Sequence, residues 1–88
     1  MLFLATGKFT VAATSIPDGA EEVRVMRDLV GSGEVREAWI YSDRSAVALV
    51  LELSSEAEAQ TVISSLPFVS ERVLAFDIVE IAPLFPGL

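Results

Sequence analysis

The feature that most constrains the fold is the order in which strand-like and helix-like segments follow one another along the chain. Apolar, β-compatible runs predict strands over residues 2–9, 35–41, 46–53 and 72–82. Between the first and second of these, and between the third and fourth, apolar residues recur at helical spacing instead. The predicted order is therefore β-α-β-β-α-β, which is two βαβ halves of similar length.

Both predicted helices begin with the spacing of a capping box. In that arrangement a polar residue bonds the backbone N–H three residues on, and the residue there bonds back. Asp18 with Glu21 fits the first helix, and Ser55 with Glu58 fits the second. The first helix is expected to bury Ala20, Val23, Met26, Leu29 and Val30, and the second Ala59, Val62, Ile63 and Leu66. A glycine-containing segment ends the first helix, and the Leu-Pro pair after the second ends that one.

Right-handed crossovers place both helices on one face of a four-stranded antiparallel sheet. The predicted fold class is therefore α+β, in the ferredoxin-like βαββαβ arrangement. The chain has 88 residues, which fits a single domain spanning residues 1–88. A chain of this length buries only about 60–65% of its unfolded surface, so its own core is marginal.

The strand patterns are apolar on both faces, although helices can cover only one. In the third strand the bulky residues alternate with Ala46, Ala48, Val50 and Glu52, which are small and mostly apolar. The hydrophobic fraction of 52% therefore exceeds what one covered face needs. We expect the second face to present Phe3, Ala46, Ala48, Val50, Ala75, Val79 and Ile81.

A second copy of the chain is the simplest partner for that second face. Two sheets packed about a two-fold axis make an isologous dimer, so we expect a homodimer or a multiple of dimers. The alanines would leave space between the sheets for a small apolar or lactone-like ligand. Alternatively, they only allow the two sheets to pack closely.

Charge and composition exclude several other partners. Six basic and thirteen acidic residues give a net charge of −7, which repels phosphate backbones and anionic lipids. We therefore expect no nucleic-acid and no membrane partner. The first eight residues lack the features of a secretory signal, so a cytoplasmic location is expected. Without cysteine or histidine, no thiol nucleophile, no metal site and no cofactor is expected.

A catalytic base in this chain would have to be a carboxylate, Tyr41 or Lys8. Glu52 is in phase with the small residues of the third strand, or else it is a strand-end residue that reaches solvent. Asp77 is unusual because aspartate is disfavoured within strands; the alternatives are a bulge, or a salt bridge to Arg36 or Arg72. Glu37 and Glu80 complete the candidates near this face, and we select Glu52, Asp77 and Glu37 as catalytic.

The candidate ligand-binding residues lie mainly in the second strand. Trp39 and Tyr41 share a face with Glu37 by the two-residue period. Their rings would suit a planar unsaturated substrate, or else ordinary packing in the core or at a dimer interface. Lys8 is the only lysine and could stabilise a developing oxyanion. Arg36 adds a basic group beside the aromatic residues.

Several segments in the C-terminal two-thirds resemble muconolactone isomerase-like and YCII-like proteins. These are VREAWIY (35–41), the strand over 45–53, SSEAEA (54–59), LPF (66–68) and VEIAPL (79–84). The resemblance implies a dimeric α+β barrel, sometimes assembled into larger rings. In characterised members it implies an isomerase that moves a double bond in an unsaturated lactone, and related barrels serve as cofactor-free monooxygenases and cyclases.

Two hypotheses for function follow. The first is a cofactor-free isomerase, or a related ring-modifying enzyme, that acts on an unsaturated lactone or polyketide-like ring by carboxylate-assisted proton transfer. The alternative is a non-catalytic protein that binds a small ligand or serves as an oligomeric accessory.

Overall fold

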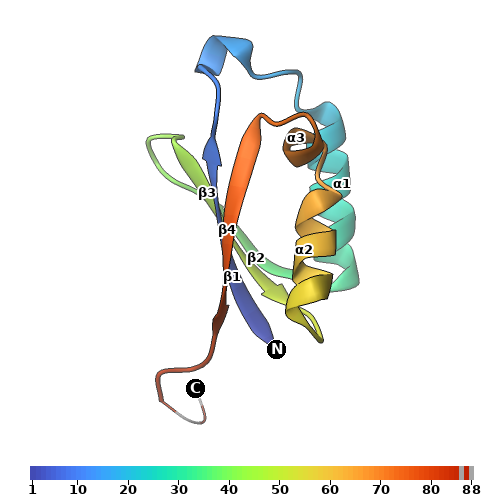
Figure 1. Cartoon of the computed structure of the whole chain (residues 1–88), viewed down its shortest axis with the longest axis vertical. Coiled ribbons are helices and arrows are strands. Elements are labelled where there is room, and N and C mark those ends of the chain that lie inside the picture. Colours follow the sequence, from blue (N-terminus) through green and yellow to red (C-terminus); the bar gives the residue numbers. More distant parts are fainter. Residues whose placement is uncertain (86, 88) are drawn as a thin grey trace.

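The computed structural model describes residues 1–85 and 87, and it has the predicted order of strands and helices. The four strands form one antiparallel sheet in the order β2-β3-β1-β4. The helices all lie on one side of this sheet, and no element of the described residues covers the other side (Figure 1). The elements are β1 (Leu2–Phe9), the 3-10 turn η1 (Ala13–Ser15), α1 (Ala20–Ser32), β2 (Val35–Ile40), β3 (Ala46–Glu52), α2 (Glu56–Ser64), α3 (Pro67–Ser70) and β4 (Leu74–Ile81).

The predicted strand boundaries agree with the structure except at the start of the last strand. β1 has the predicted bounds, and β2 and β3 each end one residue early. β4 begins at Leu74 because Arg72 adopts a left-handed backbone with φ 61°, which strands do not accommodate. Residues 83–88 follow the predicted last strand, and of these residues 86 and 88 lie outside the described part of the chain.

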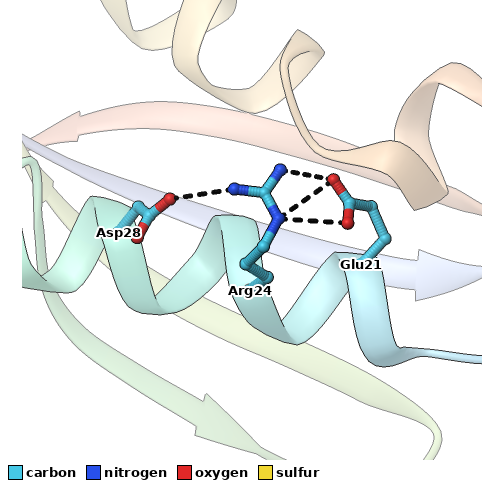
Figure 2. Close-up of polar contacts among 3 residues, drawn as sticks. All are labelled: Glu21, Arg24 and Asp28. Carbon is cyan, nitrogen blue, oxygen red and sulfur yellow. Dashed lines mark hydrogen bonds and ion pairs between the residues drawn. The ribbon is translucent and has the colours of Figure 1, made fainter.

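Helix α1 does not begin with the predicted capping box. Its N-cap is Gly19, and no side chain bonds its first N–H groups. Glu21 bonds Arg24 instead, and Arg24 also contacts Asp28, all on the outer side of the helix (Figure 2). Ion pairs as exposed as these contribute little to stability, because solvent screens the two charges. The predicted stop is confirmed: Gly33 has φ 84° and its N–H donates to the Val30 carbonyl.

The face of α1 that packs on the sheet is rotated from the predicted one. Val25, Met26 and Leu29 contact the core, whereas Val23 and Val30 are 48% and 47% exposed. The inward residues still follow helical spacing. The rotation also turns Glu22, the residue before Val23, toward α3, and the Glu22 side chain is half-buried there.

Helix α2 begins as predicted. The Ser55 hydroxyl accepts the Glu58 backbone N–H at 3.1 Å, and the Glu58 carboxylate accepts the N–H of Ser54, one residue before the cap. The predicted apolar stripe is buried: Ala59, Val62, Ile63 and Leu66. Pro67 not only follows the end of α2 but also begins α3, because proline suits the first position of a helix. The sequence analysis did not predict α3.

The core lies between the helices and the sheet, and its largest fully buried side chains are Phe3, Leu49, Leu51, Leu66 and Val35. The assignment of Phe3 to the second face was wrong, since Phe3 is 1% exposed beneath the helices. The alternation along β1 places Leu2 and Leu4 on the uncovered side instead. Gly7 also faces inward, where the Phe76 ring lies so close that an added Cβ would be 2.7 Å from it.

Candidate functional site

The side of the sheet that no helix covers, which we call the open face, is organised in four cross-strand rows. Paired residues in antiparallel strands point to the same side, so the register assigns each residue to a face. The rows are Trp39–Ala48–Thr6–Asp77, then Glu37–Val50–Leu4–Val79, then Glu52–Leu2–Ile81, and at the other end Ala46–Lys8–Ala75. The predicted site residues Lys8, Glu52 and Asp77, together with Glu37 and Trp39 of β2, therefore lie on this one surface.

The centre of the open face is apolar and its edges are polar. Leu4 and Val50 lie side by side in the middle, and Val79 at the β4 edge is 55% exposed. Four strands of six to eight residues cover a footprint of about 450 Å². The largest apolar patches on monomeric proteins are about 300–600 Å² and often mark interaction sites.

Glu37 and Trp39 lie together at the β2 edge, as the two-residue period predicted. The indole Nε1–H of Trp39 donates to Glu37 Oε1 at 3.1 Å. Trp39 is 64% exposed, so its ring forms a free apolar surface at this edge. The Glu37 carboxylate is therefore already engaged as a hydrogen-bond acceptor.

Glu52 lies at the end of β3 and pairs with Arg36, whose Nη1 is 3.5 Å from Glu52 Oε2. A bulge in β2 between Val35 and Glu37 gives Arg36 this position. The suggested pairing of Arg36 with Asp77 does not occur. β2 and β4 are at opposite edges of the sheet, three strand spacings or about 14 Å apart.

Asp77 and Lys8 are brought close to one another at the other edge. Asp77 pairs with Thr6 and Lys8 pairs with Ala75, so Asp77 and Lys8 are diagonal neighbours on the open face. Diagonal positions are about 7–8 Å apart, which long side chains can span. A carboxylate, a hydroxyl and the one ammonium side chain of the sequence therefore surround a single area.

Tyr41 lies just beyond the end of β2, at the Lys8 end of the sheet. Its backbone N–H donates to the Ala46 carbonyl at 2.8 Å, and its side chain is 47% exposed. Glu80 differs from the other candidates, because it pairs with Phe3 and so points to the helix-covered side, beyond the core. It is exposed there and does not belong to the open face.

One half-buried carboxylate on the helix side, that of Glu22, was not among the predicted site residues. Glu22 Oε1 accepts the backbone N–H of Phe68 at 3.0 Å, from α3. Burial raises the pKa of Glu22, the nearby charge of Glu71 raises it further, and the Phe68 N–H partly opposes this. The sequence did carry a signal, since Glu22 stands at helical spacing from the inward Val25, Met26 and Leu29.

The described residues were also considered for metal ligands and for a membrane-spanning helix, and they provide neither. Among residues 1–85 and 87, no three acidic side chains come together in a way that could hold a metal ion. In the same part of the chain, no helix is both long enough and apolar enough to cross a bilayer.

The fold defines a class of small α+β proteins with a helix layer on one side of a four-stranded sheet. Within it, the chain is similar to muconolactone isomerase, known from a crystal structure at 3.3 Å resolution. The TM-score is 0.81 at 17% identity, and the match covers 100% of this chain and 94% of that one. The chain therefore has a muconolactone isomerase-like fold, as the resemblance implied. No family model and no curated protein sequence matches it.

Proposed function

We propose that the chain acts as a homodimer, or a multiple of dimers, in which two open faces pack together. We further propose that it is a cofactor-free isomerase that shifts a double bond in an unsaturated lactone or polyketide-like ring. The observation that carries this proposal is the apolar open face with Asp77, Thr6 and Lys8 around one area. The similarity of the fold to that of an isomerase supports it.

The case for self-association rests on the exposed apolar surface. Leu2, Leu4 and Val50 are only half-buried in the single chain, and Val79 is more exposed still. A second copy offers a surface of the same shape and composition, so the contact is self-complementary about a two-fold axis. Covering the face would also remove water from the charged groups at its edge.

The proposed chemistry is a proton transfer between two carbons of the ring. The Asp77 carboxylate takes a proton from the carbon beside the carbonyl, and the electron pair of that C–H bond moves into the ring to give an enolate. The Lys8 ammonium stabilises the negative charge on the carbonyl oxygen. Asp77 then returns the proton to a different ring carbon, so that the double bond has moved and no atoms are gained or lost.

The other candidate residues have supporting roles in this scheme. Trp39 lies in the same row as Asp77, and only the small side chains of Ala48 and Thr6 stand between them. A planar ring can therefore lie across the row against the indole. Glu37 and Glu52 are alternative bases, although one accepts the Trp39 N–H and the other pairs with Arg36. Arg36 and Tyr41 flank the ends of the face, where they can contact polar substituents.

A second candidate function has its own support. Two of the three candidate carboxylates are already engaged, and all three are exposed at the edge of the face. That arrangement is also typical of a non-catalytic protein whose apolar sheet drives oligomerisation. Such a protein would form the same oligomer but would not convert any substrate.

Sedimentation velocity at micromolar concentration tests the assembly. We expect a dimer or a multiple of it for the wild-type chain, and a monomer for Val79→Glu, which puts a charge on the open face. Val30→Glu is the matched control, because Val30 is similarly exposed but lies on α1. A wild-type monomer, or a dimer that only Val30→Glu disrupts, would contradict the proposed interface.

A panel of unsaturated lactones, followed by the ultraviolet absorbance change as the double bond moves, tests the activity. If Asp77 is the base, Asp77→Asn should lower kcat about 10²- to 10⁴-fold. Lys8→Met should lower it as well, and Glu37→Gln and Glu52→Gln should have smaller effects. Equal rates for all four variants would remove these assignments. A dimer without any turnover would favour the non-catalytic function.

A further inference from the structure

A hollow lies on the helix-covered side of the sheet, opposite the open face, between the sheet and the part of the helix layer where α1 meets α3. Its volume is about 310 Å³, equal to about ten water molecules of liquid and within the range of small-ligand sites. The apolar lining residues come from all four strands and from α1 and α3: Phe9, Val23, Met26, Ile40, Val47, Phe68 and Leu74. α1 and α3 are in contact above the sheet at this point (Figure 1).

The hollow has a closed floor and an open mouth. Phe68 and Leu74 at the floor are 8% and 4% exposed, whereas Val23 and Ile40 at the rim are 48% and 46% exposed. A ligand can therefore enter past α1 and the edge strand β2 without unfolding either element. Because the whole lining comes from one chain, this site does not depend on a dimer.

Two charged side chains of α1, Glu22 and Arg27, also line the hollow. Glu22 uses Oε1 to accept the Phe68 N–H. Among the residues that the structure describes, no donor bonds its second oxygen. Arg27 also lines the hollow, and none of the ion pairs found in the same described residues involves it. Glu22 and Arg27 are five positions apart on α1, about 7.5 Å along the axis, which matches a six-membered ring with substituents at opposite ends.

We propose that this hollow binds a single-ring aromatic hydroxy acid. The ring lies among the apolar side chains, the hydroxyl donates to Glu22 Oε2, and the carboxylate meets the Arg27 guanidinium. The hydroxyl is the group that Glu22 selects, because an ionised carboxylate only accepts hydrogen bonds. Burial raises the pKa of Glu22 and so makes it a stronger acceptor. Arg27 supplies the attraction for an anion that the net charge of −7 would otherwise repel.

Glu22 also has a structural role, and the test must separate the two. Its bond to the Phe68 N–H ties α3 to α1 and satisfies a donor that no other side chain caps. Glu22→Gln retains an amide oxygen for that bond but removes the charge. The substitution therefore leaves the tie in place and weakens the contact to the ligand.

Methyl ¹H–¹³C NMR of the wild-type chain, titrated with 4-hydroxybenzoate, tests the proposal. We expect shifts centred on Met26, Val23 and Val47, with a Kd of about 1 mM or tighter. Benzoate should bind about tenfold more weakly, because Glu22 loses its partner, and phenol should also bind more weakly, because Arg27 loses its own. No shifts at about 5 mM ligand, or equal affinities for the three compounds, would overturn the proposal.

Matched variants sharpen the assignment. Glu22→Gln should weaken 4-hydroxybenzoate about fivefold and Glu21→Gln should not, since Glu21 bonds Arg24 on the outer side of the helix. Val47→Phe should abolish binding by filling the hollow; if it does not fold, the ligand series on the wild-type chain still decides. The monomeric Val79→Glu should bind as the wild type does. Shifts on Leu4, Val50 and Val79 would instead place the ligand on the open face, and so overturn this inference while supporting the proposed function.

Discussion

The two faces of the sheet differ far more in burial than in composition. Along β1, Phe3 and Ala5 are 1% and 0% exposed, while Leu2 and Leu4, which alternate with them, are only half-buried. All four side chains are apolar. The difference arises because, in the part of the chain that the structure describes, the helices α1, α2 and α3 lie on one side of the sheet and none lies on the other.

The charges are distributed differently as well. The helix-covered side buries no charged group completely, and Glu22 is the half-buried carboxylate beside its hollow. The open face carries Glu37, Glu52 and Asp77 around an apolar centre, with Lys8 beside Asp77. An apolar surface with a charged edge is typical of an interface, whereas an enclosed apolar surface is typical of a core. Hydrophobicity along a strand thus does not say which role a face has.

A pair of identical truncations on the two faces gives the largest expected difference. Leu51→Ala should lower the free energy of unfolding by about 2–5 kcal/mol, because Leu51 is fully buried and the shorter side chain leaves a cavity in the core. Leu4→Ala should cost less than about 1 kcal/mol in the monomer but should weaken the dimer about tenfold. Urea unfolding and sedimentation measure the two quantities. Equal losses of stability for both variants would mean that the faces are not distinct.

A methyl group added to the covered face should have a moderate effect. Gly7→Ala places a Cβ 2.7 Å from the Phe76 ring, so the ring must move and the free energy of unfolding should fall by about 1–3 kcal/mol. Gly31→Ala is the control, since nothing lies within 4 Å of its added Cβ and α1 should gain about 0.5–1 kcal/mol. Thermal unfolding distinguishes them. An unchanged Tm for Gly7→Ala would show that Phe76 is loosely held.

The salt concentration should change the affinity of the dimer that the open face forms, and it should leave the packing of the core unchanged. Each chain carries a net charge of −7, so two copies repel one another at low ionic strength. Raising the salt concentration shortens the Debye length and should tighten the dimer, by roughly threefold between about 0.02 M and 0.3 M. Sedimentation equilibrium checks this. A dimer that weakens with salt would instead show that Lys8 and Arg36 pair with carboxylates of the other copy.

The smallest expected effect concerns the pH dependence of stability through Glu22. Burial raises its pKa above 4.5, so its contribution to stability is fully present below 4.5 and is lost as the pH rises through the raised value. Glu22→Gln cannot ionise. The stability of the wild-type chain relative to this variant should therefore fall as the pH increases.

Glu58→Gln provides a control of opposite sign for that measurement. Hydrogen bonds from Ser54 lower the pKa of Glu58, so its contribution is present above 4.5 and is lost as the pH falls. Urea unfolding at several pH values compares the two variants. If both differences changed in the same direction with pH, Glu22 would not be buried as the structure shows.

Much of the fold could be predicted because the signals are local. The four strands and two main helices follow from residue periods, and the Ser55–Glu58 cap follows from a three-residue spacing. The same spacing failed at Asp18 and Glu21, since Arg24 offered Glu21 a better partner. The grouping of Glu37 with Trp39 was also predictable, because a strand places alternate residues on one side.

The rest of the site depended on which strands are neighbours. The diagonal placement of Lys8 and Asp77, 69 positions apart in the sequence, follows from the pairing of β1 with β4. The pairing of Arg36 with Glu52 needed the bulge in β2. The rotation of α1 that turns Glu22 inward depended on how α1 meets α3. None of these can be read from the residues adjacent in the sequence.

The sequence by itself determined the α+β class, the order of the elements and the apolar character of both sides of the sheet, because backbone periodicity and turn chemistry act over a few residues. Only the tertiary structure decided that Phe3 is core and Leu4 is surface. It also decided that a hollow with Glu22 opens beneath α1, and that Asp77 has Lys8 as its neighbour. These outcomes depend on the side of the sheet that the helices cover and on long-range strand register, and both are set by the packing of the whole chain.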